Sequence, residues 1–264
     1  MSGGGVARRG PDFVQSLERG LTVIRAFDHE HSELTLSEVA AVTGLTRAVA
    51  RRFLLTLASL GYVRSDGRFF SLTAKVLELG YAYLSSLSLP EVAEPHLEAL
   101  VSEVNESSSV SVLDGHDVVY VARVPVSRIM TVSISVGTRF PAYATSMGRV
   151  LLAGLPEPDL SSYLSSVRLS PLTARTVTSV TALRGEVAKV RAQGWALVNQ
   201  ELEEGLRALA APIRDRTGKV VAALNVSAHA SRTSLESMRR DLLPPLLKAA
   251  AHVEADLPSR TRRS

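Results

Sequence analysis

Residues 35–63 read TLSEVAAVTGLTRAVARRFLLTLASLGYV, and this stretch decides the fold of the N-terminal part of the chain. Thr35 and Glu38 have the spacing of a capping box, which predicts a helix that begins directly after Thr35. Gly44 can adopt the positive φ that ends this helix, and Thr46 can cap the next one. A short helix, a glycine turn and a longer helix predict a helix-turn-helix.

The second helix presents a basic face without acidic residues. Arg47 and Arg51 are one turn apart, Arg52 lies beside them, and Ala48 is small enough to let the helix approach base edges. Arginine suits both phosphates and the guanine edge in the major groove. The alternative is a solvated basic helix in an ordinary helical domain. The ordered series of cap, glycine turn, second cap and hairpin favours DNA binding.

A hairpin signal follows the second helix. The Ser65–Gly67 turn separates two short segments, 62–64 and 68–70, as in a β-hairpin. This hairpin makes the motif winged, and Arg64 and Arg68 lie where a wing contacts the DNA backbone. The expected DNA-binding residues are Thr35, Ser37, Thr46, Arg47, Ala48, Arg51, Arg52, Arg64 and Arg68.

Apolar residues at helical spacing predict which faces of these helices are buried. The expected inward-facing residues are Leu36, Val39 and Ala40 in the first helix of the motif, and Val49, Phe53, Leu57 and Leu60 in the second. A preceding helix over residues 16–28 is expected to pack on both through Leu17, Leu21, Ile24 and Ala26 or Phe27.

The composition narrows the class of protein. A chain of 264 residues, 45% of them hydrophobic, is expected to form two domains with real cores. The absence of cysteine excludes disulfides, a thiolate nucleophile and a cysteine zinc site. A net charge of +4 indicates local rather than general basicity. Neither a secretory signal nor a membrane-spanning apolar run occurs, so a cytoplasmic protein is expected.

Four regions are expected along the chain. Residues 1–12 form a disordered tail, 13–72 a winged helix-turn-helix domain, 73–89 a linker helix, and 90–258 a domain of mixed helices and strands. The linker helix carries an apolar stripe. This stripe predicts either contact with another subunit or packing on the adjacent domain, and both interpretations stay open.

The pattern of the C-terminal region predicts an antiparallel sheet framed by helices. Helices are expected at 91–104, 146–153, 159–166 and 180–193, with a final helix over 234–255 that Pro244 and Pro245 must break. Strands are expected at 109–113, 118–124, 129–136, 195–199, 206–213 and 220–228.

Catalytic groups are poorly supported in this region. Thr145-Ser-Met-Gly148 is not a nucleophile elbow, and no histidine suggests a triad. His116 lies between two aspartates in a turn, where a solvated turn is favoured over a metal site. The Glu201–Glu204 cluster is expected to be an exposed loop, because no ligand-spaced His, Cys or Asp accompanies it. No glycine-rich phosphate loop occurs, so neither a cofactor nor an enzyme is expected.

A binding pocket is a better-supported interpretation. Residues 137–148 form a loop that enters a helix, and helix N-termini present free amides to anions. Thr145 and Ser146 add hydroxyl groups. Asn225 and Ser227 alternate along the last strand and therefore point to one face of it. These groups could hold a small carboxylate. Alternatively, Ser146 merely caps its helix and Ser227 merely ends a strand.

Several strings of this sequence resemble the IclR family of bacterial transcription regulators over nearly the whole chain. They are similar in particular to the subgroup that controls the β-ketoadipate pathway of aromatic catabolism. The strings are GLTRAVARRFLLTL (44–57), GYAYLSS (80–86), VLDG (112–115), YVARV (120–124), RIM (128–130), TSMGRVLLA (145–153) and ELEEGL (201–206).

The resemblance implies an α+β protein with a winged helix-turn-helix domain, a linker helix and a GAF-like effector-binding domain. It implies a dimer, or a dimer of dimers, on a palindromic operator. The effector would be protocatechuate, 4-hydroxybenzoate, β-ketoadipate or a similar acid. The family's pocket maps onto Thr145, Ser146, Met147, Val198, Asn199, Ala208, Asn225 and Ser227 of this chain. Arg123, Arg128 and Arg139 are candidates to pair with the effector's carboxylate.

Two other classes of function make different predictions. An enzyme with an appended basic domain would turn over its ligand, and DNA would be indifferent to that ligand. An architectural DNA protein would bind without sequence preference, and the large pocket-bearing domain argues against it. Activators and repressors share all these elements, so the sign of regulation does not follow from the sequence.

Overall fold

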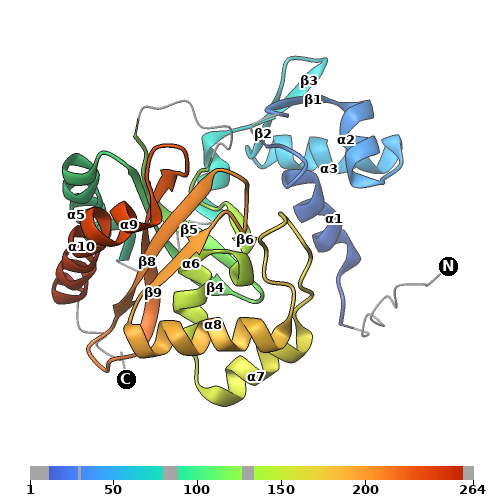
Figure 1. Cartoon of the computed structure of the whole chain (residues 1–264). Helices are drawn as coiled ribbons and strands as arrows, with labels where there is room; N and C mark the ends of the chain where they lie inside the picture. The colour runs from blue at the N-terminus through green and yellow to red at the C-terminus, as the bar shows by residue number, and fades with distance from the viewer. Residues whose placement is uncertain (1–11, 29–30, 80–88, 127–133, 258–264) are drawn as a thin grey trace. The chain divides into compact units, whose positions relative to one another are not determined.

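The computed structural model describes residues 12–28, 31–79, 89–126 and 134–257, which fall into two compact units that divide near residue 85 (Figure 1). Three expectations lie wholly or mainly outside the described residues: the tail at 1–12, the greater part of the linker helix, and the strand at 129–136. Arg128 lies outside them too. Among the described residues, no helix is long and apolar enough to cross a lipid bilayer.

The N-terminal unit is a winged helix-turn-helix (Figure 1). Its elements are α1 (Gln15–Ile24), β1 (Glu33–Thr35), α2 (Leu36–Thr43), α3 (Arg47–Ser59), β2 (Val63–Ser65), β3 (Phe69–Leu72) and the 3₁₀ turn η1 (Ala74–Leu77). The three strands form an antiparallel sheet in the order β1-β3-β2. The sequence pattern did not predict β1, which has only three residues.

The helix boundaries in this unit follow from side-chain caps. The Thr35 hydroxyl accepts a hydrogen bond from the Glu38 amide at 3.4 Å, and the Thr35 amide donates to the Glu38 carboxylate at 2.7 Å. Gly44 ends α2 with a φ of 67°, and the Thr46 hydroxyl accepts from the Val49 amide at the start of α3. The predicted capping box, glycine turn and second cap are therefore confirmed. Each such cap typically contributes about 1 kcal/mol.

The buried face of α3 differs from the prediction. Ala50, Leu54 and Leu57 are buried, whereas Leu60 is 53% exposed. Val49 and Phe53 are only half-buried. Apolar residues occupy two overlapping helical stripes in this segment, and periodicity cannot choose between them. The choice is made by the elements that pack on the helix.

The packing of α1 also differs from the prediction. Leu17 and Leu21 are 63% and 48% exposed, whereas Val23, Ala26 and Phe27 are buried. The helix ends at Ile24, so Ala26 and Phe27 enter the core from the segment that follows it. Helix α1 therefore contributes to the core of the unit through its C-terminal end and the residues that follow it, not along its whole length.

The C-terminal unit contains a six-stranded antiparallel sheet in the order β6-β5-β4-β9-β8-β7. Its strands are β4 (Ser107–Asp114), β5 (Asp117–Val124), β6 (Arg139–Pro141), β7 (Ala196–Asn199), β8 (Leu206–Arg214) and β9 (Val220–His229). Its helices are α5 (Leu89–Val104), η2 (Ala142–Ala144), α6 (Ser146–Ala153), α7 (Glu157–Ser166), α8 (Val180–Gln193), α9 (Leu235–Ser237), η3 (Met238–Leu242) and α10 (Leu243–Asp256).

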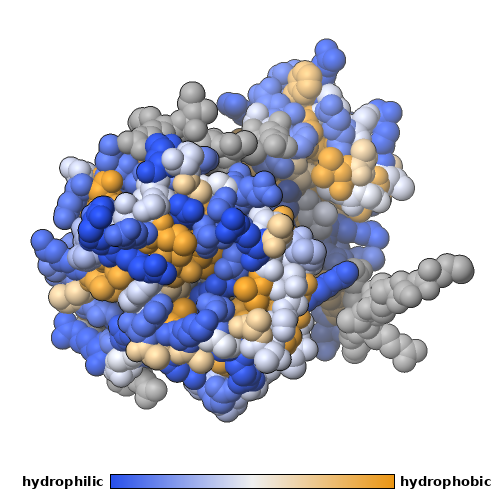
Figure 2. All heavy atoms as spheres, in the orientation of Figure 1, coloured by the Kyte–Doolittle hydropathy of each residue, from blue (hydrophilic) through white to orange (hydrophobic). Residues whose placement is uncertain are grey.

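Helices cover both faces of this sheet (Figure 1). On one face, α5 and α10 bury residues such as Leu97 and Leu246 against the strands. On the other face, α6, α7 and α8 bury Met147, Leu160 and Leu183. Each fully buried leucine contributes roughly 1.5–3 kcal/mol to folding. Hydrophilic side chains cover most of the visible surface of this unit, with apolar side chains in small patches between them (Figure 2).

The structure tests two predicted features of this unit. In the described part of the strand expected at 129–136, residues 134–136 form no strand, and among the described strands β6 is the edge strand that pairs with β5. The predicted break in the final helix is present, because η3 ends at Leu242 and α10 begins at Leu243, directly before Pro244 and Pro245. These prolines stand in the first turn of α10, where they displace no helical hydrogen bond, and a π-helical turn precedes them.

Candidate functional site

Helix α3 presents an exposed basic face in the N-terminal unit. Arg47, Ala48, Arg51 and Arg52 are all exposed. The helix contains no acidic residue that would repel a phosphate. This face has the size and charge that entry into the major groove requires.

The predicted wing is present beside this helix. Asp66 accepts hydrogen bonds from the amides of Arg68 and Phe69, which closes the hairpin turn and lowers the pKa of Asp66. The guanidinium of Arg68 lies 5.1 Å from the centre of the Phe69 ring. Arg64 donates from Nε to the Ser71 hydroxyl at 2.9 Å, which leaves its terminal nitrogens for other contacts.

The three hydroxyl residues predicted to contact DNA have different environments. Thr35 and Thr46 cap their helices, so each hydroxyl already accepts a hydrogen bond from a backbone amide of the protein. Ser37 is exposed in the first turn of α2. The contacts of the two threonines therefore support a role in positioning helices α2 and α3.

A pocket that is partly open to solvent lies in the C-terminal unit between the start of α6, the sheet and the turn that joins β7 to β8. The lining residues are Tyr120, Ile134, Ala144, Thr145, Ser146, Met147, Val198, Leu202, Leu206, Ala208, Asn225 and Ser227.

The first turn of α6 supplies backbone donors to this pocket. Thr145 caps the helix, because its hydroxyl accepts from the Gly148 amide at 3.0 Å and its carbonyl accepts from the Arg149 amide. The amides of Ser146 and Met147 have no acceptor within the helix. Ser111 donates to the Met147 sulfur at 3.1 Å, which fixes that side chain on the sheet. The start of α6 is thus arranged to receive an anion.

A row of polar side chains crosses the sheet beside the pocket, which Asn225 lines and which Ser109 and Arg123 do not. Arg123 pairs with Ser109 across β5 and β4, and Ser109 pairs with Asn225 across β4 and β9, so all three face the same side. The Arg123 guanidinium donates to the Ser109 hydroxyl at 3.2 Å. Burial lowers the pKa of Arg123. In the described part of the chain, no carboxylate pairs with this arginine.

Asn225 has an unsatisfied acceptor. It is 3% exposed, and its amide nitrogen donates to the Ser227 hydroxyl at 2.9 Å. Its Oδ1 is buried and has no hydrogen-bond donor among the described residues. A buried amide oxygen normally has a partner, so this atom indicates a ligand group that donates a hydrogen bond.

Tyr120 adds a neutral phenol to the pocket wall. Its ring lies against Phe140 with centres 5.7 Å apart. Burial raises the pKa of Tyr120 to about 12, so the phenol keeps its proton at neutral pH. An aromatic wall beside polar groups suits a small aromatic acid.

Two of the predicted pocket residues lie elsewhere. Asn199 follows Val198 on β7 and therefore faces the opposite side of the sheet, where it accepts from Arg207 Nε at 2.8 Å. Arg139 lies at the edge of the sheet, 44% exposed, and is paired with Asp114 and Asp117. Strand alternation and these acidic partners take both residues out of the pocket.

Several lining residues did not stand out in the sequence. Tyr120, Ile134, Ala144, Leu202 and Leu206 carry only apolar or aromatic groups, apart from one phenol. Their patterns are those of ordinary core residues, so the sequence held no signal that could have identified them.

The acidic cluster is not a simple exposed loop. Glu201 is 7% exposed and forms an ion pair with Arg149 at 2.5 Å. In the same turn Glu203 is half-buried and Glu204 is exposed. Among the described residues, no group of three or more acidic, histidine or cysteine side chains is placed to hold a metal ion.

Models of known protein families match nearly the whole chain. Residues 16–67 match the IclR helix-turn-helix domain, and residues 81–255 match the C-terminal domain of the bacterial transcriptional regulator IclR. The Pca regulon regulatory protein of Pseudomonas putida is 46% identical over 91% of this chain and 83% of its own length.

Solved structures give the same result. A transcriptional regulator from Rhodococcus sp. RHA1 is 61% identical, with a TM-score of 0.84 over 93% of this chain and 98% of its own. An IclR homologue of Microbacterium hydrocarbonoxydans, solved with 4-hydroxybenzoate, is 26% identical, with a TM-score of 0.82 over 92% and 98% of the two chains. The family and these relatives are transcriptional regulators rather than enzymes. The chain therefore belongs to the IclR family of transcriptional regulators, and its likeness to the Pca regulon protein places it in the β-ketoadipate-pathway subgroup.

Proposed function

We propose that this regulator binds a specific operator and that a small hydroxylated aromatic carboxylate controls its binding. The observation that carries this proposal is the pairing of anion donors at the start of α6 with the unsatisfied Asn225 oxygen in one pocket. The carboxylate would lie at the α6 amides and Arg123, and the ring hydroxyl would donate to Asn225. Protocatechuate and 4-hydroxybenzoate have both groups, whereas β-ketoadipate has no ring hydroxyl.

The proposed output is sequence-specific DNA binding in the cytoplasm. Helix α3 enters the major groove, and the wing contacts phosphates. A homodimer, or a dimer of dimers, places two such helices on a palindromic operator. Residues 13–72 are the DNA-binding domain, 90–258 the effector domain, and 73–89 the connection through which the effector acts. The required coupling is modest, about 1–3 kcal/mol.

A footprint of the region upstream of the protein's own gene tests this function. We expect protection of a palindromic site that changes in extent or affinity when protocatechuate or 4-hydroxybenzoate is added. Turnover of the acid, together with protection that is indifferent to it, would instead support an enzyme with an appended basic domain.

The role of Arg123 can be tested by calorimetry with 4-hydroxybenzoate. Arg123→Met should weaken binding by roughly 10- to 150-fold, which corresponds to the loss of a hydrogen bond to a charged group. Arg139→Met is the matched control, because Arg139 is half-exposed and already paired with two aspartates. Equal effects of the two substitutions would contradict the assignment of Arg123.

The role of Asn225 can be tested with a ligand that lacks the donor. 4-Fluorobenzoate is close in size to 4-hydroxybenzoate and has no hydroxyl proton to donate. We expect wild-type protein to bind it roughly tenfold or more weakly, since a buried acceptor then stays unpaired. Asn225→Leu should remove this preference. Equal binding of the two acids by the wild type would exclude a donor-specific contact.

A further inference from the structure

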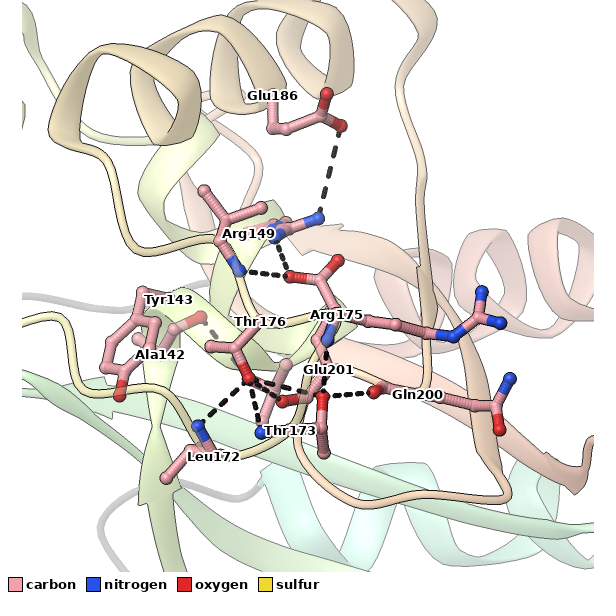
Figure 3. A network of polar contacts seen from close by, with 12 residues as sticks. Ala142, Tyr143, Arg149, Leu172, Thr173, Arg175, Thr176, Glu186, Gln200 and Glu201 are labelled. Carbon is pink, nitrogen blue, oxygen red and sulfur yellow. Dashed lines mark hydrogen bonds and ion pairs between the residues drawn. The ribbon is translucent and has the colours of Figure 1, made fainter.

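A buried ion pair joins helix α6 to the turn that follows β7 (Figure 3). Arg149, in the first turns of α6, is 2% exposed and donates from Nη2 to Glu201 at 2.5 Å. Glu186 of α8 lies on the other side of the guanidinium, 4.0 Å from Nη1. The Arg149 Nε–H is buried without an acceptor among the described residues. The arginine therefore pairs with carboxylates from two segments and leaves one of its own donors unsatisfied.

Glu201 is tied to a third segment as well. Its carboxylate also accepts from the Val177 amide at 3.2 Å, and its carbonyl accepts from the Thr176 hydroxyl at 2.7 Å. The neighbouring Gln200 carbonyl accepts from the Thr173 hydroxyl at 2.7 Å. The segment 172–177, the turn after β7 and helix α6 thus meet at one carboxylate (Figure 3).

Both partners of this ion pair belong to walls of the pocket. Ser146 and Met147, which line the pocket, precede Arg149 in the same helix. Leu202, which also lines the pocket, belongs to the turn that contains Glu201, and Leu206, another lining residue, begins β8 directly after this turn. The ion pair therefore joins two walls that are more than 50 residues apart in the sequence.

The turn that carries Glu201 has an unusual backbone. Gln200 has a φ of 60° and Gly205 a φ of 82°. Two hydrogen bonds close the turn. The Gln200 amide donates to the Leu206 carbonyl at 2.7 Å, and the Gly205 amide donates to the Gln200 side-chain oxygen. A non-glycine residue keeps a left-handed conformation only where its surroundings fix it.

We propose that the Arg149–Glu201 pair is a positioning clamp that sets the distance between the α6 wall and the 202–206 wall of the pocket. Neither side chain lines the pocket, so the pair acts on the effector only through the walls that it holds. The inference rests on the effector site proposed above. It adds residues that determine effector affinity without contacting the effector.

Stability alone does not account for a buried ion pair. Removing two charges from water is costly, and well-packed apolar side chains can often replace such a pair without loss of stability. A clamp has a different requirement. Its geometry is fixed by directed bonds from one guanidinium to one carboxylate, which apolar contacts do not reproduce.

Hydrogen exchange of the effector-free full-length protein tests the clamp without any ligand. Glu201→Gln should raise exchange in peptides 172–178 and 200–206 by about tenfold or more, because local opening becomes easier. Peptides that cover β4 and β5 should not change. Unchanged exchange in the first two peptides would overturn the proposal. Glu157→Gln is the matched control, because Glu157 pairs with Arg184 and Arg191 at the exposed side of α7 and α8.

Calorimetry with 4-hydroxybenzoate and protocatechuate tests the consequence for affinity. The double variant Arg149→Met/Glu201→Leu should have a Tm close to that of the wild type. Its affinity for whichever acid the wild type binds should nevertheless be about tenfold or more lower than the wild-type affinity. Wild-type affinity in this variant would overturn the clamp. If the wild type binds neither acid, the effector class proposed above is wrong, and hydrogen exchange alone decides on the clamp.

Discussion

Replacing Gly148 with alanine should destabilise the C-terminal unit by roughly 3 kcal/mol or more, because overpacking against backbone atoms has no easy relief. A Cβ atom at this position would lie 2.0 Å from the Ala142 carbonyl oxygen and 2.4 Å from the Ala142 Cα. These are backbone atoms of η2, so no side-chain rotation removes the clash. Helix α6 would have to move away from η2, and the pocket wall at Thr145–Met147 would move with it.

Thermal unfolding measures this effect. For a unit of this size, a loss of 3 kcal/mol corresponds to a fall in Tm of roughly 6–12 °C. Gly185→Ala in α8 is the matched control, because nothing lies within 4 Å of a Cβ there. That substitution should be neutral or should stabilise the helix by up to about 1 kcal/mol. If the Gly148→Ala variant has the same Tm as the wild type, the backbones of α6 and η2 are not in contact.

The features of the fold that the sequence predicted correctly depend on local signals. The capping box at Thr35, the turn at Gly44 and the hairpin at Asp66 each depend on atoms a few residues apart, and all three are present. The buried faces of α1 and α3 depend on which distant elements pack on them. Leu21 and Leu60 were therefore expected inside and are exposed.

The pocket shows the same division between local and distant causes. Ser146, Asn225 and Ser227 could be predicted, because polar groups at a helix start and on a strand face are conspicuous in a sequence. Leu202 could not, because an apolar side chain in a turn resembles any other. Glu201 was expected to be exposed, since the partner that buries it lies 52 positions earlier in the chain.

The second large effect concerns DNA binding by α3. Arg47→Ala and Arg52→Ala should each reduce the affinity for the operator by roughly 1–3 kcal/mol, if each arginine binds a guanine edge through two hydrogen bonds. Both side chains are exposed, so the substitutions leave the core intact. If the two contacts are independent, the double variant loses about 2–6 kcal/mol, which removes specific binding at physiological salt.

Fluorescence anisotropy on the operator and on a shuffled duplex, at two salt concentrations, separates the two kinds of contact. Loss confined to the operator identifies an arginine that reads bases. Equal loss on both duplexes, with a salt slope reduced by about 1, identifies an arginine that contacts a phosphate. Arg216→Ala, in an exposed turn of the C-terminal unit, controls for the removal of a positive charge. Wild-type affinity in both α3 variants would exclude this face of the helix from the DNA interface, because an exposed arginine in the major groove cannot be removed without a measurable loss.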